Sequence, residues 1–198
     1  MKMIQTASRQ LRWTGMVLVL LLGTAGAADE DMCPQVLVRD TSSRMLAALR
    51  DEKEAIAADA GYLYELVAEI VLPSFDFLRL SQWVLGRNWR TATESQRAQF
   101  VEQFRRLLVR TYGSALSEYA DEKIIYLPFA GAGDARTVTV RTEIEQVGAP
   151  IPISYSMYRS PDGWKVYDAV ANGASAVAFY RSYFTAALRR HGPDIVLR

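Results

Sequence analysis

Hydrophobic positions recur every three to four residues through much of the first 120 residues, a spacing that predicts helices. The clearest case is Thr93 to Tyr119, where large apolar side chains share one face and charged side chains take the other. Thr93 and Gln96 fit a capping box, in which each side chain satisfies the other's free backbone N–H group. Weaker helical patterns cover Val36 to Ala58 and Tyr62 to Leu72.

The stretch that follows Pro73 is apolar around nearly the whole circumference of the helix it predicts. Proline ends the preceding helix, and Ser74 or Asp76 is expected to cap the new one, which runs to Gly86. Its large apolar residues are Phe75, Phe77, Leu78, Leu80, Trp83, Val84 and Leu85. Such a helix is either enclosed by protein on all sides, or turns one face toward something apolar that is not protein.

Downstream of the long helix the apolar spacing changes to every second residue, which predicts strands. The expected strands are Ile124 to Phe129, Thr137 to Val147, Ile151 to Arg159 and Trp164 to Val170. Short turns rich in Gly and Pro separate them, as between antiparallel neighbours, and helical spacing resumes over Ala174 to Arg190. The order predicts an α+β fold, with N-terminal helices and a C-terminal helix packed on a four-stranded antiparallel sheet.

The N-terminus has the composition of an export signal. Three basic residues precede a short apolar run over residues 13–22, and Ala25, Gly26 and Ala27 provide the small side chains that a signal peptidase needs. The run is short for a membrane span, so cleavage after residue 27 is favoured over retention as an anchor. The remaining residues, 28–198, suit one domain.

Charge and cysteine content narrow the function. With the signal removed, the 22 acidic residues slightly outnumber the basic ones, so the chain has no electrostatic basis for wrapping nucleic acid. Cys33 is the only cysteine, and acidic residues precede it in place of the small apolar residues of a lipid-attachment site. With one Cys and one His, no zinc site of nitrogen and sulfur ligands can form. The sequence predicts no cofactor and leaves the role of Cys33 open.

Asp168 is the strongest candidate for chemistry. It alternates with Val166 along a strand, so it is expected on the same, buried side of the sheet. A buried carboxylate needs a partner or a shifted pKa. It could act as the general base of an isomerase-like enzyme, but pairing with an arginine such as Arg181 or Arg87 is the favoured interpretation.

Five segments together resemble the MlaC family, also called toluene-tolerance auxiliary proteins. They are LPSFDF (72–77), VLGRNWRTATESQRAQF (84–100), FRRLLVRTYGSAL (104–116), WKVYD (164–168) and SAVAFYRSYF (175–184). The resemblance implies an NTF2/cystatin-like arrangement with an apolar lipid pocket between helices and sheet. It also implies a monomeric periplasmic phospholipid carrier, not an enzyme, that works between an outer-membrane lipoprotein complex and an inner-membrane ABC transporter with an MCE-type subunit. Such a carrier maintains membrane lipid asymmetry.

In that interpretation the extra apolar surface faces acyl chains. The residues expected to line the pocket are Phe75, Phe77, Leu80, Trp83, Val84, Leu108, Tyr112, Ile153, Tyr155, Met157, Val166, Ala174 and Ala178. Each could equally be an ordinary core residue, because cores and tail pockets use the same side chains. An adaptor with a filled core therefore remains an alternative.

Two further expectations concern the cargo. Members of the family often carry Glu-Gly-Val-Ser where this chain has Asn-Gly-Ala-Ser over residues 172–175, and the small Ala174 predicts a roomier pocket that could take a hopanoid or another lipid. Arg79, Arg87 and Arg90 are candidates to meet a phosphate group at the pocket mouth.

Overall fold

The computed structural model describes residues 33–118 and 121–192 of the 198-residue chain. The predicted signal over residues 1–27 lies outside the described residues. The helical elements are α1 (Pro34–Asp51), α2 (Lys53–Ala58), α3 (Ala60–Ile70), the short 3₁₀ helix η1 (Leu72–Ser74), α4 (Phe77–Leu85), α5 (Arg87–Thr91), α6 (Glu94–Glu118) and α7 (Ala176–His191). Among these described helices none is long and apolar enough to cross a membrane.

The strands form one antiparallel sheet in sequence order, which confirms the predicted α+β fold. They are β1 (Ile124–Tyr126), β2 (Thr137–Ile144), β3 (Ile151–Ser160), β4 (Gly163–Ala171) and β5 (Ala174–Ser175). The sheet has a fifth strand because Ala174 and Ser175, expected in the last helix, pair with the end of β4. Asn172 and Gly173 both have positive φ, as a tight two-residue hairpin requires.

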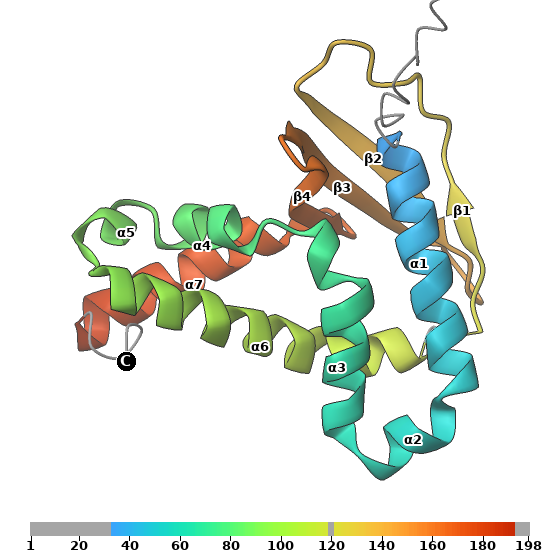
Figure 1. Cartoon of the computed structure of the whole chain (residues 1–198), viewed down its shortest axis with the longest axis horizontal. Coiled ribbons are helices and arrows are strands. Elements are labelled where there is room, and N and C mark those ends of the chain that lie inside the picture. The colour runs from blue at the N-terminus through green and yellow to red at the C-terminus, as the bar shows by residue number, and fades with distance from the viewer. Residues whose placement is uncertain (1–32, 119–120, 193–198) are drawn as a thin grey trace, which may run out of the picture.

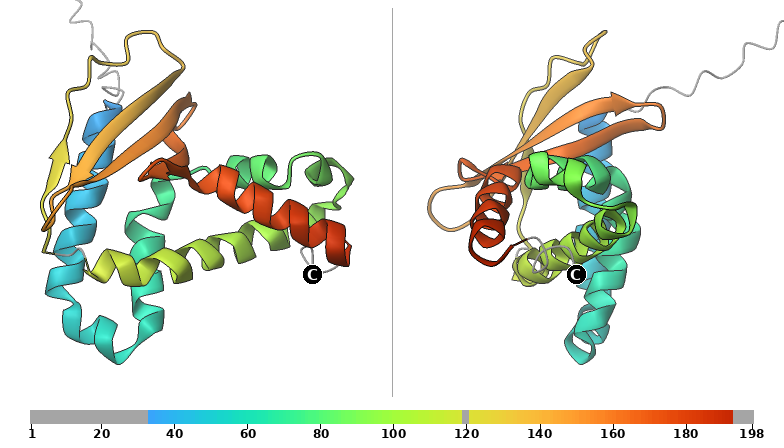
Figure 2. Two further views of the ribbon diagram at one scale, coloured as in Figure 1. Left: turned by 180° about the vertical axis from the view of Figure 1, so that it is seen from behind. Right: turned by 90° about the vertical axis from the view of Figure 1, so that its left-hand side faces the viewer.

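The helices are arranged in two groups, one at the sheet and one beyond its end (Figure 1). In the first group α1 packs on β2 and on α3, and α3 packs on α6. In the second group α4 packs on α6 and α7 and extends, together with α5, away from the sheet (Figure 2). The long helix α6 belongs to both groups and connects them.

The capping box predicted at the start of α6 is confirmed. The backbone N–H of Thr93 donates to Gln96 Oε1 at 2.9 Å, and the N–H of Gln96 donates to Thr93 Oγ1 at 3.2 Å. This box sets where α6 begins, because it satisfies two backbone donors that a helix start leaves free.

Other predicted helix boundaries were wrong. The helix expected over 36–58 is interrupted at Glu52, which separates α1 from α2. The helix expected from Ser74 begins only at Phe77, because Phe75 is extended and forms a bridge with Val166 of β4. Of the two candidate caps, Asp76 fulfils the role, since its Oδ1 accepts from the N–H of Arg79 at 2.9 Å.

Among the described residues the core consists of three hydrophobic clusters instead of one continuous mass. The first joins α4, α6 and α7 around Phe104 and Val84. The second joins α1, α3 and α6 around Met45, and the third joins α1 to the sheet around Met157. The three clusters surround a space that their own side chains do not fill.

Candidate functional site: an apolar cavity between the sheet and the helices

An apolar cavity of ≈ 490 Å³ lies where the three clusters meet. Its walls come from α1, α3, η1, α4, α6, the strands β1 to β5 and the start of α7, so segments distant in sequence converge on it. The volume falls within the range of roughly 300–1,000 Å³ typical of pockets for small organic ligands. The cavity is therefore large enough to take a guest, and its walls favour hydrocarbon.

The structure brings nine of the thirteen predicted pocket residues to the cavity wall. They are Phe75, Phe77, Leu80, Leu108, Tyr112, Ile153, Tyr155, Val166 and Ala174. In β3, Ile153 and Tyr155 are two residues apart and so project from the same side of the sheet.

The other four predicted residues do not line the cavity. Trp83 is 42% exposed, with its ring edge-on to Tyr167 at 4.8 Å between centroids. Val84 is buried in the cluster between α4, α6 and α7, and Met157 in the cluster between α1 and the sheet. Ala178 is exposed on α7.

The circumference of α4 explains why its residues divide in this way. All four of Phe77, Leu80, Val84 and Leu85 belong to the cluster with α6 and α7, but of these only Phe77 and Leu80 also reach the cavity. Leu78 lies at the surface, with 53% of its side chain exposed. The apolar residues of α4 thus face three environments: the cavity, the cluster with α6 and α7, and the protein surface.

Sequence reasoning missed the contribution of α1. This helix lines the cavity with Leu37, Val38, Thr41, Met45 and Leu46. Their spacing of three and four residues was the available signal, because it places them on one helix face. The prediction placed the pocket between the sheet and the helices, but the residues expected to line it included none from this helix.

The hydroxyl groups of α1 at the cavity are paired within the protein. Ser42 Oγ donates to the carbonyl of Val38 at 2.7 Å and lies 2.6 Å from the hydroxyl of Tyr126. Thr41 Oγ1 lies 3.0 Å from Ser74 Oγ. Burial raises the pKa of Tyr155, so this phenol stays neutral at physiological pH. None of the described residues that line the wall carries a charge, as a site for hydrocarbon requires.

Partly exposed residues mark where the cavity opens to the surface. Tyr112 of α6 is 46% exposed and Phe179 of α7 is 59% exposed, and both line the cavity. Ala174 of β5 also lines the cavity and is exposed. We refer to Tyr112, Ala174 and Phe179 as the cavity mouth.

A β-bulge overturns the predicted position of Asp168. Met157 pairs with Val166 and Ser156 pairs with Asp168, so β4 has one extra residue, Tyr167, at this point. The extra residue inverts the alternation of β4. Beyond the bulge Ala169 lines the cavity, and Asp168 points away from the side of Val166.

Asp168 holds the start of α7 and has no arginine partner of the predicted kind. Its Oδ2 accepts from Ser175 Oγ at 2.7 Å, and its Oδ1 accepts from the N–H of Val177 at 3.1 Å. Within the described part of the chain, neither Arg181 nor Arg87 forms an ion pair with it. The carboxylate thus acts as a structural cap at the junction of β5 and α7.

The three arginines considered for a phosphate at the mouth lie elsewhere. The guanidinium of Arg79 stacks on the ring of Tyr158 at 3.8 Å, and the hydroxyl of Tyr158 donates to Asp76. Arg87 and Arg90 belong to α5, and none of the three lines the cavity. Over residues 33–118 and 121–192 there is also no group of three or more His, Cys, Asp or Glu placed to hold a metal ion.

Comparison with known proteins identifies a family and individual proteins whose sequences resemble this chain. The sequence model of the MlaC protein family matches residues 39–198. The chain is 29% identical over 164 residues to the toluene tolerance protein ttg2D of Pseudomonas putida, with 82% of this chain and 76% of that protein covered. It is 27% identical over 185 residues to the intermembrane phospholipid transport system binding protein MlaC of Haemophilus influenzae, with 91% and 86% covered.

A solved structure shares the fold. The phospholipid-binding protein from Ralstonia solanacearum, determined in complex with a phospholipid, superimposes with a TM-score of 0.76 at 31% sequence identity. The match covers 80% of this chain and 89% of that one. The fold described above is therefore one in which a phospholipid has been seen bound.

Proposed function

Because the chain belongs to the MlaC family, we propose that it is a periplasmic lipid carrier that encloses the acyl chains of a phospholipid in its apolar cavity. The observation that carries the proposal is the cavity itself. Its volume is ≈ 490 Å³, and none of the described residues that line it is charged. It opens at the cavity mouth, Tyr112, Ala174 and Phe179. The relatives support it, since one is named as a phospholipid transport binding protein and another has been solved with a phospholipid.

The wider role of the carrier belongs to the same proposal. It receives and delivers lipid between an outer-membrane lipoprotein complex and an inner-membrane ABC transporter with an MCE-type subunit, and so maintains lipid asymmetry. The nine predicted residues at the cavity wall contact the tails. The protein performs no catalysis in this role, and the engagement of both Asp168 oxygens by Ser175 and Val177 supports that view.

Tail burial limits what such a carrier can do. Roughly 30 methylenes at about 0.8 kcal/mol each represent a gross gain of about 24 kcal/mol relative to water. The same tails gain nearly as much in a bilayer. The carrier thus lowers the barrier to crossing water, whereas the direction of transport must come from differential binding by its partners or from their ATP use.

A second cargo class is favoured by one specific feature of the wall. Four alanines, Ala169, Ala171, Ala174 and Ala176, line the cavity from β4, β5 and the start of α7. Small side chains on one wall leave room for a broad, rigid lipid such as a hopanoid. Ala178, which was expected to add to this wall, does not.

Native mass spectrometry of protein purified from periplasm, followed by lipid extraction, tests both cargoes. A copurifying phospholipid supports the carrier as proposed, and a copurifying hopanoid supports the second cargo. Protein that is consistently empty, even after incubation with phospholipid vesicles, would contradict the carrier and favour an adaptor. Turnover of a small substrate that is lost in Asp168→Asn would favour an enzyme.

A further inference from the structure

A second, polar cavity lies toward the C-terminal end of α7, whereas the apolar cavity lies at the start of this helix. Its volume is ≈ 460 Å³, and it is formed between the turn that joins α4 to α5 and the last turns of α7. It shares no lining residue with the apolar cavity, and the aromatic rings of Phe104, Tyr180 and Phe184 pack between the two ends of α7. Ten residues separate Phe179 at the apolar mouth from Arg189 here, which corresponds to about 15 Å along a helix.

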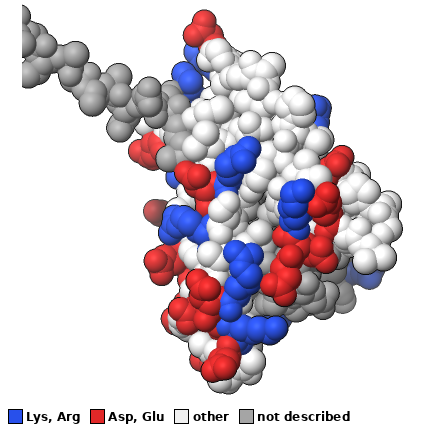
Figure 3. Space-filling view, turned by 90° about the vertical axis from the view of Figure 1, so that its right-hand side faces the viewer, with Lys and Arg blue, Asp and Glu red and all other residues white. Residues whose placement is uncertain are grey.

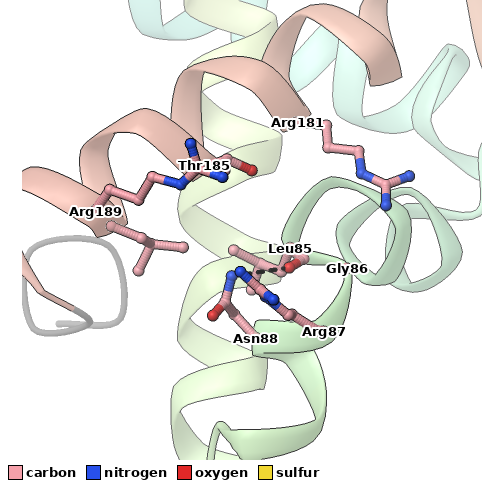
Figure 4. A pocket seen from close by; sticks show the side chains of 8 residues that line it. Leu85, Gly86, Arg87, Asn88, Arg181, Thr185 and Arg189 are labelled. Carbon is pink, nitrogen blue, oxygen red and sulfur yellow. Dashed lines mark hydrogen bonds between the residues drawn. The ribbon is translucent and has the colours of Figure 1, made fainter.

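Three arginines from two elements line this polar cavity (Figure 4). Arg181 and Arg189 come from α7, and Arg87 comes from the start of α5 on the opposite side. We call this set the arginine pocket. No acidic residue is among its lining residues, and within the described ranges no carboxylate forms an ion pair with any of the three.

Acidic residues are few in the described segments that form this end of the protein. Residues 85–101 and 176–192 contain one acidic residue, Glu94, against six arginines: Arg87, Arg90, Arg97, Arg181, Arg189 and Arg190. On the face seen in Figure 3, at the opposite side of the molecule, acidic and basic side chains are interspersed. Like charges held close together repel, so this end of the protein favours an anion.

The local backbone builds the pocket from both sides. Residues 181, 185 and 189 are four apart, which puts Arg181, Thr185 and Arg189 in one row along α7. Gly86, with φ 55°, makes the turn that faces this row, in a backbone conformation that other residues rarely adopt. Nη2 of Arg181 lies 3.5 Å from where a Cβ on Gly86 would stand, so its guanidinium lies against the turn.

We propose that the arginine pocket is a second binding site, which takes a phosphate-type oxyanion supplied by free phosphate or by the headgroup of an anionic lipid. The planar guanidinium groups match the paired oxygens of a phosphate, and Thr185 adds a neutral hydroxyl donor. Arg181 is two residues from Phe179 at the mouth, whereas Arg189 is ten residues away, about 15 Å along α7, so the pocket extends away from the mouth. The two cavities share no lining residue, so the proposal does not depend on the cargo of the apolar cavity.

Two binding measurements on the whole mature protein test this site. Calorimetry with inorganic phosphate, at constant ionic strength in chloride, tests the free anion. Cosedimentation with phosphatidylcholine vesicles, with and without phosphatidylglycerol, tests the headgroup. In whichever assay the wild type binds, we expect Arg181→Ala and Arg87→Ala to weaken binding about tenfold each, the loss of one charge-assisted hydrogen bond.

Matched variants separate a built pocket from a generally positive surface. Arg90→Ala and Arg190→Ala remove the same charge at the same end of the molecule but outside the pocket, and we expect binding to stay within about twofold of wild type. Arg181→Lys keeps the charge but loses the planar guanidinium, whose parallel N–H groups can bind two oxygens at once, so we expect it to weaken binding as well. Lipid loading, measured by native mass spectrometry on the same variants, should be unchanged.

The outcomes are distinct. Variant-sensitive binding of inorganic phosphate supports the site with a free anion as ligand, and variant-sensitive binding to phosphatidylglycerol vesicles alone supports it with a headgroup. The proposal is overturned if the wild type binds neither, if Arg90→Ala weakens binding as much as Arg181→Ala, or if Arg181→Lys binds as tightly as wild type. Because loading of the apolar cavity is measured separately, failure here leaves the carrier proposal standing.

Discussion

The two groups of helices bury the same kinds of side chain but differ in how completely they fill the space between them. Beyond the sheet, Phe100, Phe104, Tyr180 and Phe184 pack ring against ring, with centroids 5.2 Å apart for Phe104 and Tyr180 and 5.1 Å apart for Phe100 and Phe184. At the sheet, aliphatic and aromatic residues of similar size enclose ≈ 490 Å³ that no side chain of the described residues occupies.

The position of small residues along α7 accounts for part of the contrast. We call the filled group of α4, α6 and α7 beyond the sheet the solid group. Within it α7 contributes the large side chains of Tyr180 and Phe184. At the cavity, by contrast, the wall residues of α7 begin with the small Ala176, two residues after Ala174 of β5. An unfilled apolar space forfeits dispersion contacts that a packed core would make. The comparison teaches that the cavity is lined like an ordinary core but has small side chains on one wall, which leaves room for a guest.

The largest expected effect comes from placing a charge in each region. Val84→Glu puts a carboxylate at a position that is 1% exposed in the solid group, and we expect the protein not to fold, because an unpaired buried charge costs several kcal/mol. Ala174→Glu puts the same group at the cavity mouth, where it reaches water. We expect a change in unfolding free energy of less than about 1 kcal/mol but loss of bound lipid.

Urea denaturation and native mass spectrometry measure these two effects separately. Ala174→Ser is the matched control for the second variant, because it is small and uncharged and should load lipid like the wild type. If Ala174→Glu unfolded like Val84→Glu, the mouth would be part of a packed core and the contrast between the two regions would be wrong.

A comparison of Phe104→Ala with Phe179→Ala tests the same contrast without introducing a charged side chain. Phe104 is 2% exposed and contacts three aromatic rings, so its removal should lower the unfolding free energy by about 3–5 kcal/mol. Phe179 is 59% exposed at the mouth, and its removal should cost less than about 1 kcal/mol in delipidated protein. Urea denaturation of both variants checks this. Similar losses for the two would show that the two regions are equally packed.

The elements that the sequence predicted well are those that a local pattern determines. Helix α6 shows an apolar face and a capping box, and the observed α6 begins at Glu94 as that box requires. The three long strands β2, β3 and β4 overlap their predicted ranges, because alternation and turn residues are also local signals. The MlaC family was likewise identified correctly from five short segments.

The errors came from features that depend on contacts distant in sequence. The extra residue Tyr167 leaves no trace in the alternation of β4, so Asp168 was placed on the wrong side and Ala169 was missed. Phe75 looks helical until its bridge to Val166 is known. Whether an apolar residue faces a cavity or a neighbour is set by the opposite wall, which is why Val84 and Leu80 on one helix could not be told apart.

The smallest expected effect is on the pH dependence of stability, and it reports on the cavity from within. Burial raises the pKa of Tyr155 above its ordinary value of 10.0, so the native state retains this proton at pH values where the unfolded chain has lost it. The resulting stabilisation is fully present below about pH 10 and is lost as the pH rises through the folded-state pKa. Tyr155→Phe should therefore lose stability less steeply than wild type above pH 10, by at most about 1.4 kcal/mol per pH unit.

Filling the cavity should enlarge this effect, because lipid tails remove water from the same phenol. Ultraviolet titration of tyrosinate in lipid-loaded and delipidated protein, with Tyr155→Phe subtracted from each, isolates this residue. We expect ionisation of Tyr155 to need a higher pH in the loaded protein. An identical titration in the two states would mean that the guest does not reach Tyr155, and that the tails occupy only the part of the cavity nearer the mouth. The solid group of helices offers no such difference, because nothing enters it.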